Sequence, residues 1–410
     1  MNADIIIVGG GASGLAAAIE SKKICTNSRI VIVERLDRVG RKILATGGGK
    51  CNLGNSHLGA EYYHGSIQPI EIIRKSISTE KFFSNIGVLC TEDIEGRMYP
   101  RSNSAATVLN ALRLKAESLG IEEKCGFEMK NFMKHKNQIK IYSEQGEEIY
   151  CKRLIIAAGG YAAPSFGTDG GVLRLLKNKG YKIAKICPSV APLNVRADLL
   201  KGLKGIRVKG KISAVCNGMT LKEQVGEIQF TENTISGICV FNLAYLFGKY
   251  GEKLVLRADF LPDMKEKDVK EYLLFIYQGR KNCNLEELLT GMLVKNLAIY
   301  ITKRVLNRPL TDKISTLSDD EIRNIAKAVK CFEFPISGCS SWKNAQCTYG
   351  GVHVDCIDEN LESKIDRGVY LCGEILDVSG DCGGYNLKWA WASGNWAARN
   401  CANSINGGKL

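Results

Sequence analysis

Three glycines near the N-terminus, and an acid that follows them, form the first pattern that could do chemistry. Gly9, Gly11 and Gly14 come after the apolar run of residues 5–8 and before an alanine-rich segment. In a strand–turn–helix unit the first glycine permits a tight turn, the second lets backbone approach a pyrophosphate, and the third allows close helix–strand packing. Glu34 lies 20 residues beyond Gly14, where an acid can hold ribose hydroxyls. The pattern predicts a dinucleotide site, whose remaining members are Ala12, Ser13 and Arg35.

A second segment, residues 41–52, places three successive glycines between basic residues. Such a backbone could pass against a flat ring, with cations beside phosphate or ribityl oxygens. A plain surface loop rarely has this composition, so we expect the segment to contact a cofactor. The expected contacts are Arg41, Lys42, Thr46, Gly48, Gly49, Cys51 and Asn52.

The C-terminal region carries a third pattern, which decides between NAD and FAD. Residues 373–377 follow a predicted strand, and residues 383–387 open the last predicted helix. An acid after a strand can hold ribityl hydroxyls, and a helix N-terminus can stabilise negative charge on a reduced flavin ring. NAD enzymes have no use for this additional C-terminal motif, so the sequence predicts FAD. The expected contacts are Gly373, Glu374, Asp377, Gly384, Tyr385, Asn386 and Leu387.

These segments require an α/β fold to bring them together. The predicted buried strand at 154–158 ends in small residues, a meander is predicted over 121–150, and the residue pattern changes after residue 188. We predict a Rossmann-type FAD-binding domain, with a central parallel sheet and a β-meander, interrupted by an inserted β-plus-helical domain. The predicted parts are residues 1–189 and 336–410 for the FAD-binding domain and 190–335 for the insertion, which is β-rich over 195–260 and helical over 264–330.

With these motifs in place, the sequence resembles the BaiN-like, or YhiN-like, family of bacterial flavoproteins, some of whose members are described as aminoacetone oxidases. The matching segments follow the family's order through the whole chain: residues 7–14, 41–52, 96–100, 157–160, 345–352, 373–377 and 383–394. The resemblance implies bound FAD and a three-part fold. It adds Met129, whose strand commonly offers backbone to the adenine, and the small residues Ala157, Ala158 and Gly159.

One departure from the family concerns a histidine that usually follows a Phe-Thr pair. Here Phe230 and Thr231 are followed by Glu232. If that histidine touches substrate in relatives, the substrate or the chemistry of this chain differs.

The flavin ring would carry out the redox chemistry, and no catalytic acid–base motif is visible. The four histidines form no motif, and Tyr349 and Tyr385 could donate a proton or pack. Ser56 stands five positions after Cys51, so the cysteine pair of disulfide-reducing flavoproteins is missing. No second dinucleotide fingerprint occurs in 190–335, so any NAD(P)H would dock transiently at the flavin. We expect hydride transfer with a small organic substrate. Reduction of a conjugated ketone and oxidation of an amine by O2 both remain open.

Composition limits the remaining function classes. The net charge of +13 suits a polyanion, and a flavoprotein acting on tRNA is an alternative. The lysines are dispersed, however, so a nucleic-acid partner is not expected. No signal peptide or membrane span is expected, which predicts a cytoplasmic protein with free thiols among its 16 cysteines. No metal site is predicted, and the oligomeric state stays open.

Overall fold

The chain folds into two compact units. One comprises residues 1–188 and 342–410, and the other comprises residues 189–341. The computed structural model describes residues 2–405. The second unit extends beyond residue 335 because strand β17 (Phe332–Cys339) pairs with strands β12 (Leu193–Val195) and β16 (Leu254–Asp259).

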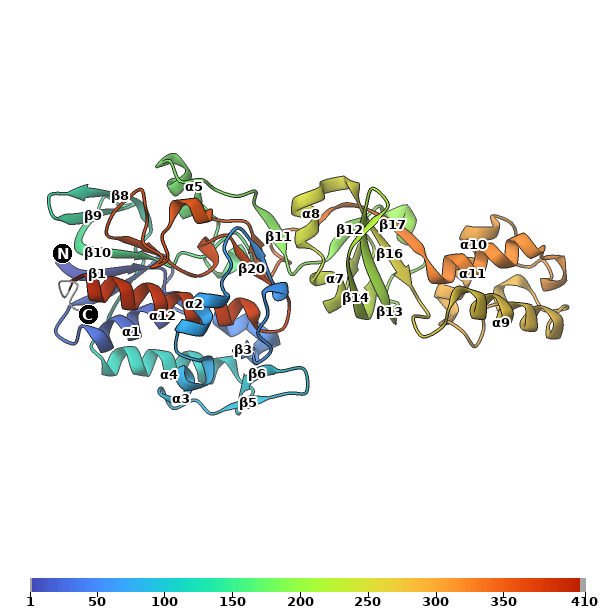
Figure 1. The fold of residues 1–410 in the computed structure, drawn as a ribbon, viewed down its shortest axis with the longest axis horizontal. Helices are drawn as coiled ribbons and strands as arrows, with labels where there is room; N and C mark the ends of the chain where they lie inside the picture. The colour runs from blue at the N-terminus through green and yellow to red at the C-terminus, as the bar shows by residue number, and fades with distance from the viewer. Residues whose placement is uncertain (1, 406–410) are drawn as a thin grey trace. The chain divides into compact units, whose positions relative to one another are not determined.

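The first unit is built on a sheet with a parallel centre and an antiparallel extension (Figure 1). The parallel strands lie in the order β7 (Glu122–Cys125), β2 (Ile30–Glu34), β1 (Asn2–Val8), β10 (Glu148–Ile156) and β19 (Val369–Leu371). The first half of β10 pairs with the meander strand β9 (Gln138–Ser143), which in turn pairs with β8 (Met129–His135). The predicted meander at 121–150 is therefore only partly correct, because its first strand, β7, joins the parallel strands instead of the meander. Strands β1 and β2 are apolar on both faces, as strands covered on both sides require.

Helices α1 (Ala12–Ile24) and α12 (Tyr385–Ile405) run side by side on this sheet (Figure 1). Their approach is close because small residues face each other: a Cβ on Gly394 would lie 2.4 Å from the Ser13 carbonyl oxygen. Trp391 on α12 is buried against Phe82 and Phe83. The unit's other helices are α2 (Ile70–Lys75), α3 (Thr79–Ser84), α4 (Ala105–Ser118) and α5 (Gly171–Asn178).

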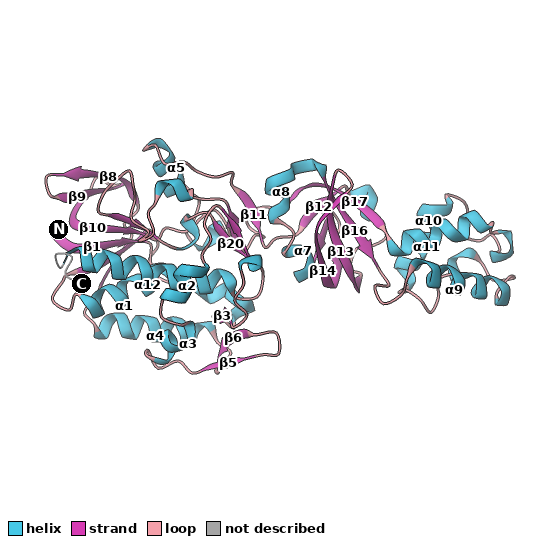
Figure 2. Cartoon of the chain, in the orientation of Figure 1, coloured by secondary structure: helices cyan, strands magenta, loops and turns pink. Residues whose placement is uncertain are grey.

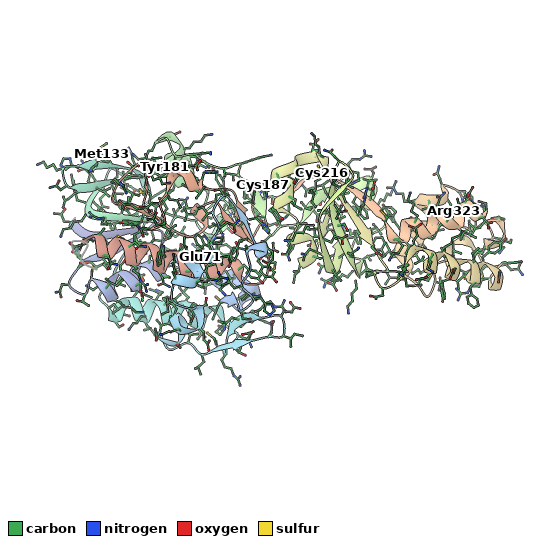
Figure 3. The ribbon with its side chains drawn as sticks, in the orientation of Figure 1. Glu71, Met133, Tyr181, Cys187, Cys216 and Arg323 are labelled. Carbon is green, nitrogen blue, oxygen red and sulfur yellow. The ribbon has the colours of Figure 1, made fainter. Side chains whose placement is uncertain are left out.

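Small sheets connect segments that are far apart in the chain. Strand β4 (Tyr63–Gly65) pairs antiparallel with β20 (Val378–Gly380), which fixes the segment leading into α12. The Tyr181 hydroxyl, labelled in Figure 3, meets Ser363 at 2.6 Å and Asp366 at 3.0 Å, so it anchors the loop before β19. The remaining small sheets are β11 (Cys187–Ser189) with β18 (Cys347–Tyr349), and β3 (Gly54–Asn55) with β6 (Arg97–Pro100) and β5 (Cys90–Glu92).

The second unit contains a closed barrel and a group of helices, shown in magenta and cyan in Figure 2. The barrel order is β12, β15 (Thr234–Ser236), β14 (Met219–Phe230), β13 (Arg207–Cys216), β16 and β17. Three longer helices stand between β16 and β17 in the chain: α9 (Glu266–Gly279), α10 (Lys295–Leu306) and α11 (Asp319–Lys330). The segment 195–260 is less purely β than expected, because it also forms α6 (Ala197–Leu200), α7 (Ile238–Phe241) and α8 (Tyr245–Tyr250). Among residues 2–405, none of the helices combines the length and apolar character that crossing a membrane requires.

Candidate cofactor-binding site

The glycine turn after β1 has the geometry of a phosphate-binding turn. Gly9 adopts a φ of +99°, and a Cβ there would lie 2.5 Å from the Ala157 carbonyl oxygen. A Cβ on Gly14 would lie 1.9 Å from the Gly9 carbonyl oxygen, so α1 packs directly on the turn. At Gly11, which caps α1, a Cβ would meet nothing within 4 Å. The open side of the turn therefore lies at the N-terminus of α1, where the helix offers N–H donors to an anion.

Glu34 ends β2 beside this turn. Its carboxylate accepts hydrogen bonds from Gly10 N at 2.8 Å and Leu36 N at 3.0 Å, one on each oxygen. Each oxygen keeps acceptor capacity for a further donor, such as a ribose hydroxyl. Glu34 thus both holds the glycine turn and faces the neighbouring cavity.

That cavity has a volume of about 330 Å³. It brings together six of the predicted residues: Gly9, Glu34, Arg35, Met129, Ala158 and Gly159. Sequence reasoning missed its other wall, the glycine-rich segment 167–171 at the N-terminus of α5. The available signal was the run of Gly167, Asp169, Gly170 and Gly171 directly before a helical pattern. Arg35 forms an ion pair with Asp169 at 3.0 Å, which ties β2 to this wall.

Lys42 and Glu374 join the two glycine-rich regions across 332 residues of sequence. Lys42 Nζ lies 2.8 Å from Glu374 Oε2, and Glu374 Oε1 accepts from Thr348 N at 2.8 Å. Burial alone would lower the pKa of Lys42, but the Glu374 carboxylate, together with Cys347, raises it above its ordinary value. Lys42 is therefore a charged residue held between the 41–52 loop and the segment after β19.

The remaining residues of the 41–52 loop have different roles. Gly48 and Gly49 adopt φ angles of +64° and +87°, and a Cβ on either would meet nothing within 4 Å. Cys51 is fully buried, and this burial raises its pKa to about 11, so its thiol is a packing group. The Thr46 hydroxyl donates to the Ile43 carbonyl at 2.6 Å. Arg41 is partly exposed and pairs with the exposed Asp37 at 3.5 Å.

The predicted C-terminal residues form a tightly bonded entrance to α12. With its amide nitrogen toward Gly54 O, Asn52 accepts from Gly384 N at 3.2 Å, which links the two motifs. Asn386 bonds both the N–H and the carbonyl of Gly380 at 2.8 Å. The Asp377 carboxylate accepts from Ser66 N at 2.8 Å.

Packing fixes the other predicted residues near α12. Tyr385 stacks on Tyr62 with ring centroids 4.5 Å apart, and burial raises its pKa, so this phenol packs. Gly373 lies over Ser13, and its carbonyl accepts from the Trp389 indole at 3.2 Å. Leu387 packs against the core of the first unit, and Ala12 does the same from α1.

The structure also contains an acid–base pair that the sequence did not reveal. His64 Nε2 lies 2.7 Å from Asp381 Oδ1, and both side chains are at least nine-tenths buried. Their separation of 317 residues leaves no local pattern to detect. Among the described residues, no group of three or more metal-binding side chains forms, and no disulfide bond joins any of the sixteen cysteines.

The chain matches a known family and several known proteins over nearly its whole length. The family model described as HI0933-like protein Rossmann domain matches residues 3–400. A 3-dehydro-bile acid delta(4,6)-reductase of Clostridium scindens is 32% identical, over 97% of this chain and 98% of the relative. A ribosomal RNA dihydrouridine synthase of Haemophilus influenzae is 25% identical, over 98% of each chain. Among solved structures, a 3-ketosteroid-delta4-(5alpha)-dehydrogenase from Rhodococcus jostii aligns with a TM-score of 0.46 and 14% identity, over 98% of this chain and 97% of that one.

The fold and this sequence relationship define an FAD-dependent oxidoreductase with a Rossmann-type domain. Three features of the chain fit the flavin cofactor: the open turn at Gly11, the cavity beside Glu34, and the second motif at α12. The chain belongs to the HI0933-like Rossmann family.

Proposed function

We propose that the protein reduces a carbon–carbon double bond conjugated to a carbonyl group in a small organic molecule, with NAD(P)H as the electron source. The observation that carries this proposal is the full-length relationship to the bile acid delta(4,6)-reductase, at 32% identity. The name of that relative describes hydrogen addition to double bonds conjugated with a 3-keto group. FAD, when bound, accepts a hydride from a nicotinamide and delivers one to a conjugated carbon.

The chain's own residues bind and orient this cofactor. The N-terminus of α1 at Gly11 would bind the pyrophosphate, and Glu34 would accept from the adenosine ribose. Lys42, held by Glu374, would supply positive charge to the phosphate or ribityl region. Asp377 and the N-terminus of α12 would hold the ribityl chain and the pyrimidine edge. Because Cys51 is buried with a raised pKa, its thiol takes no part in the proposed reaction.

A uracil base within RNA is a second candidate substrate. Dihydrouridine synthesis also adds hydrogen to a double bond conjugated with a carbonyl, and two relatives at 25% and 24% identity carry this name. The net charge of +13 favours binding to a polyanion. Both candidates require the same reaction class and differ only in the acceptor.

An anaerobic two-step experiment tests the proposal. NADH or NADPH is added to the purified flavoprotein and the loss of the flavin absorbance near about 450 nm is followed, the isoalloxazine ring being the chromophore. A 3-keto-4,6-diene steroid, or ribosomal RNA lacking dihydrouridine, is then added to the reduced enzyme. Recovery of the absorbance with the steroid supports the first candidate, and recovery with RNA alone supports the second. If neither acceptor restores the absorbance, the proposed reaction is wrong.

A further inference from the structure

His64 and Asp381 form a buried pair that cofactor binding does not explain. Strands β4 and β20 pair with His64 opposite Ser379, so Asp381, two residues later, lies diagonally across from His64 on the same face. The side chains meet at 2.7 Å and are only 10% and 5% exposed. The backbone of Asp381 is fixed as well, since its N–H donates to the Tyr62 carbonyl at 2.8 Å. The pair is therefore rigidly positioned.

The pair stands at the entrance to α12, the second cofactor motif. Only Cys382 separates Asp381 from Gly383 and Gly384, whose positive φ angles form the turn into the helix. The Asn386 amide reaches back to the Asp381 carbonyl at 3.5 Å. An acid–base group at this position lies beside the segment that we assign to the pyrimidine end of the flavin.

Two of the other three histidines, His135 and His353, lack such surroundings. His135 is exposed at the end of β8, with the Tyr150 ring edge as its neighbour. His353 is bonded to Asp355, whose side chain is 61% exposed. His64 is thus distinguished from these histidines by a carboxylate partner that is itself buried.

We propose that His64, oriented by Asp381, supplies the proton that completes reduction of the conjugated double bond. This inference rests on the proposed function. A carboxylate bonded to one ring nitrogen fixes the imidazole orientation and stabilises its protonated form, as in other acid–base pairs.

The reaction balances with this assignment. The hydride forms a C–H bond at the β carbon, and the π electrons of the double bond move toward the carbonyl. The α carbon then takes a proton from the His64 imidazolium, and the neutral imidazole regains a proton from solvent. NAD(P)H is the reductant consumed overall.

Several titratable groups surround the pair and could affect a pH profile. Asp377 lies on the segment before β20 and bonds Ser66 N, next to β4. The Tyr385 phenol on α12 lies in the field of Asp381, and Glu61 and Tyr62 precede β4. Burial raises the pKa of Cys382 to about 11. Because Tyr385 and Cys382 both have raised pKa values, we expect neither group to ionise near neutral pH.

Stopped-flow measurements on the FAD-loaded full chain can separate proton supply from a structural role. The variants are His64→Gln and Asp381→Asn, and His135→Gln is the matched control at an exposed histidine. We expect His64→Gln to bind FAD and to be reduced by NAD(P)H within about twofold of wild type. Reoxidation by the steroid dienone should slow about 100-fold or more, the usual contribution of a general acid. Reoxidation by ferricyanide, which needs no proton at carbon, should be unchanged.

Two further readouts keep the inference testable. The wild-type rate of dienone reoxidation should fall as pH rises and the imidazolium is lost, and His64→Gln should lose this dependence. NMR of FAD-free protein labelled with 15N-histidine gives the second readout. The ring N–H resonance of His64 is assigned as the one that His64→Gln lacks. In Asp381→Asn this resonance should move upfield, because the 2.7 Å hydrogen bond is weakened.

The possible results separate failure of the role proposed for His64 from failure of the proposed function. If His64→Gln reoxidises with the dienone as fast as wild type, or if dienone and ferricyanide reoxidation slow equally, the inference is overturned while the proposed function stands. If wild-type reduced flavin reacts with no conjugated acceptor, the proposed function fails and the inference fails with it.

Discussion

Replacement of Gly11 by alanine tests whether the turn after β1 binds the cofactor's phosphates. In the structure an added Cβ meets nothing within 4 Å, and Gly11 has a φ of −78°, which alanine adopts readily. The Gly11→Ala protein should therefore fold with unchanged or slightly raised stability, by at most about 1 kcal/mol. The methyl group instead occupies the open side of the turn. Loss of one charge-assisted hydrogen bond to a phosphate costs about 1.5–3 kcal/mol, so FAD affinity should fall about 10- to 150-fold.

The assay combines a thermal melt of FAD-free protein with a titration of FAD by its fluorescence. Gly14→Ala provides the contrasting variant, because its Cβ would lie 1.9 Å from the Gly9 carbonyl oxygen. That overlap should destabilise the FAD-free fold itself, by about 1–3 kcal/mol or more. Wild-type FAD affinity in Gly11→Ala would refute the assignment of the pyrophosphate to this turn.

Three other substitutions test separate parts of the site. Lys42→Met should destabilise the fold by about 1–3 kcal/mol, since it leaves the Glu374 carboxylate without its cation. Because the folded-state pKa of Lys42 is raised, this loss of unfolding free energy should be complete below about pH 10 and should shrink as pH rises through that pKa. Urea unfolding at several pH values would measure it. Cys51→Ser should change the rate of flavin reduction less than about threefold, and mass spectrometry should find Cys51 unalkylated by iodoacetamide at pH 8, because its pKa is about 11. Glu34→Gln should weaken FAD binding about tenfold in a fluorescence titration, because an amide cannot accept from both Gly10 N and Leu36 N.

The sequence predicted those parts of the site that depend on local chain geometry. Glu34 was recognisable because a strand–turn–helix–strand unit fixes its distance along the chain from Gly14. The sequence predicts Lys42 and Glu374 separately as cofactor contacts, but their ion pair joins residues 332 positions apart and has no local signature. His64 was missed for the same reason, since its partner becomes a neighbour only through the pairing of β4 with β20. The closure of the barrel through β12 and β17 is a similar long-range pairing, which explains why the end of the insertion was placed too early.

The net charge of +13 is weak evidence for an RNA substrate, because some of the basic side chains are paired with acidic ones. The most concentrated basic stretch leads into β13, whose Lys211 faces Glu223 on β14 at 3.2 Å. On the neighbouring strands of the same barrel, Arg257 pairs with Glu333 at 2.7 Å. A phosphate that approached either cation would have to displace a carboxylate. Binding to such a paired cation would therefore release fewer counterions than binding to an unpaired one. These strands therefore do not form a strong RNA-binding stripe, and the choice between a small dienone and a uracil base depends on which acceptor reoxidises the reduced flavin.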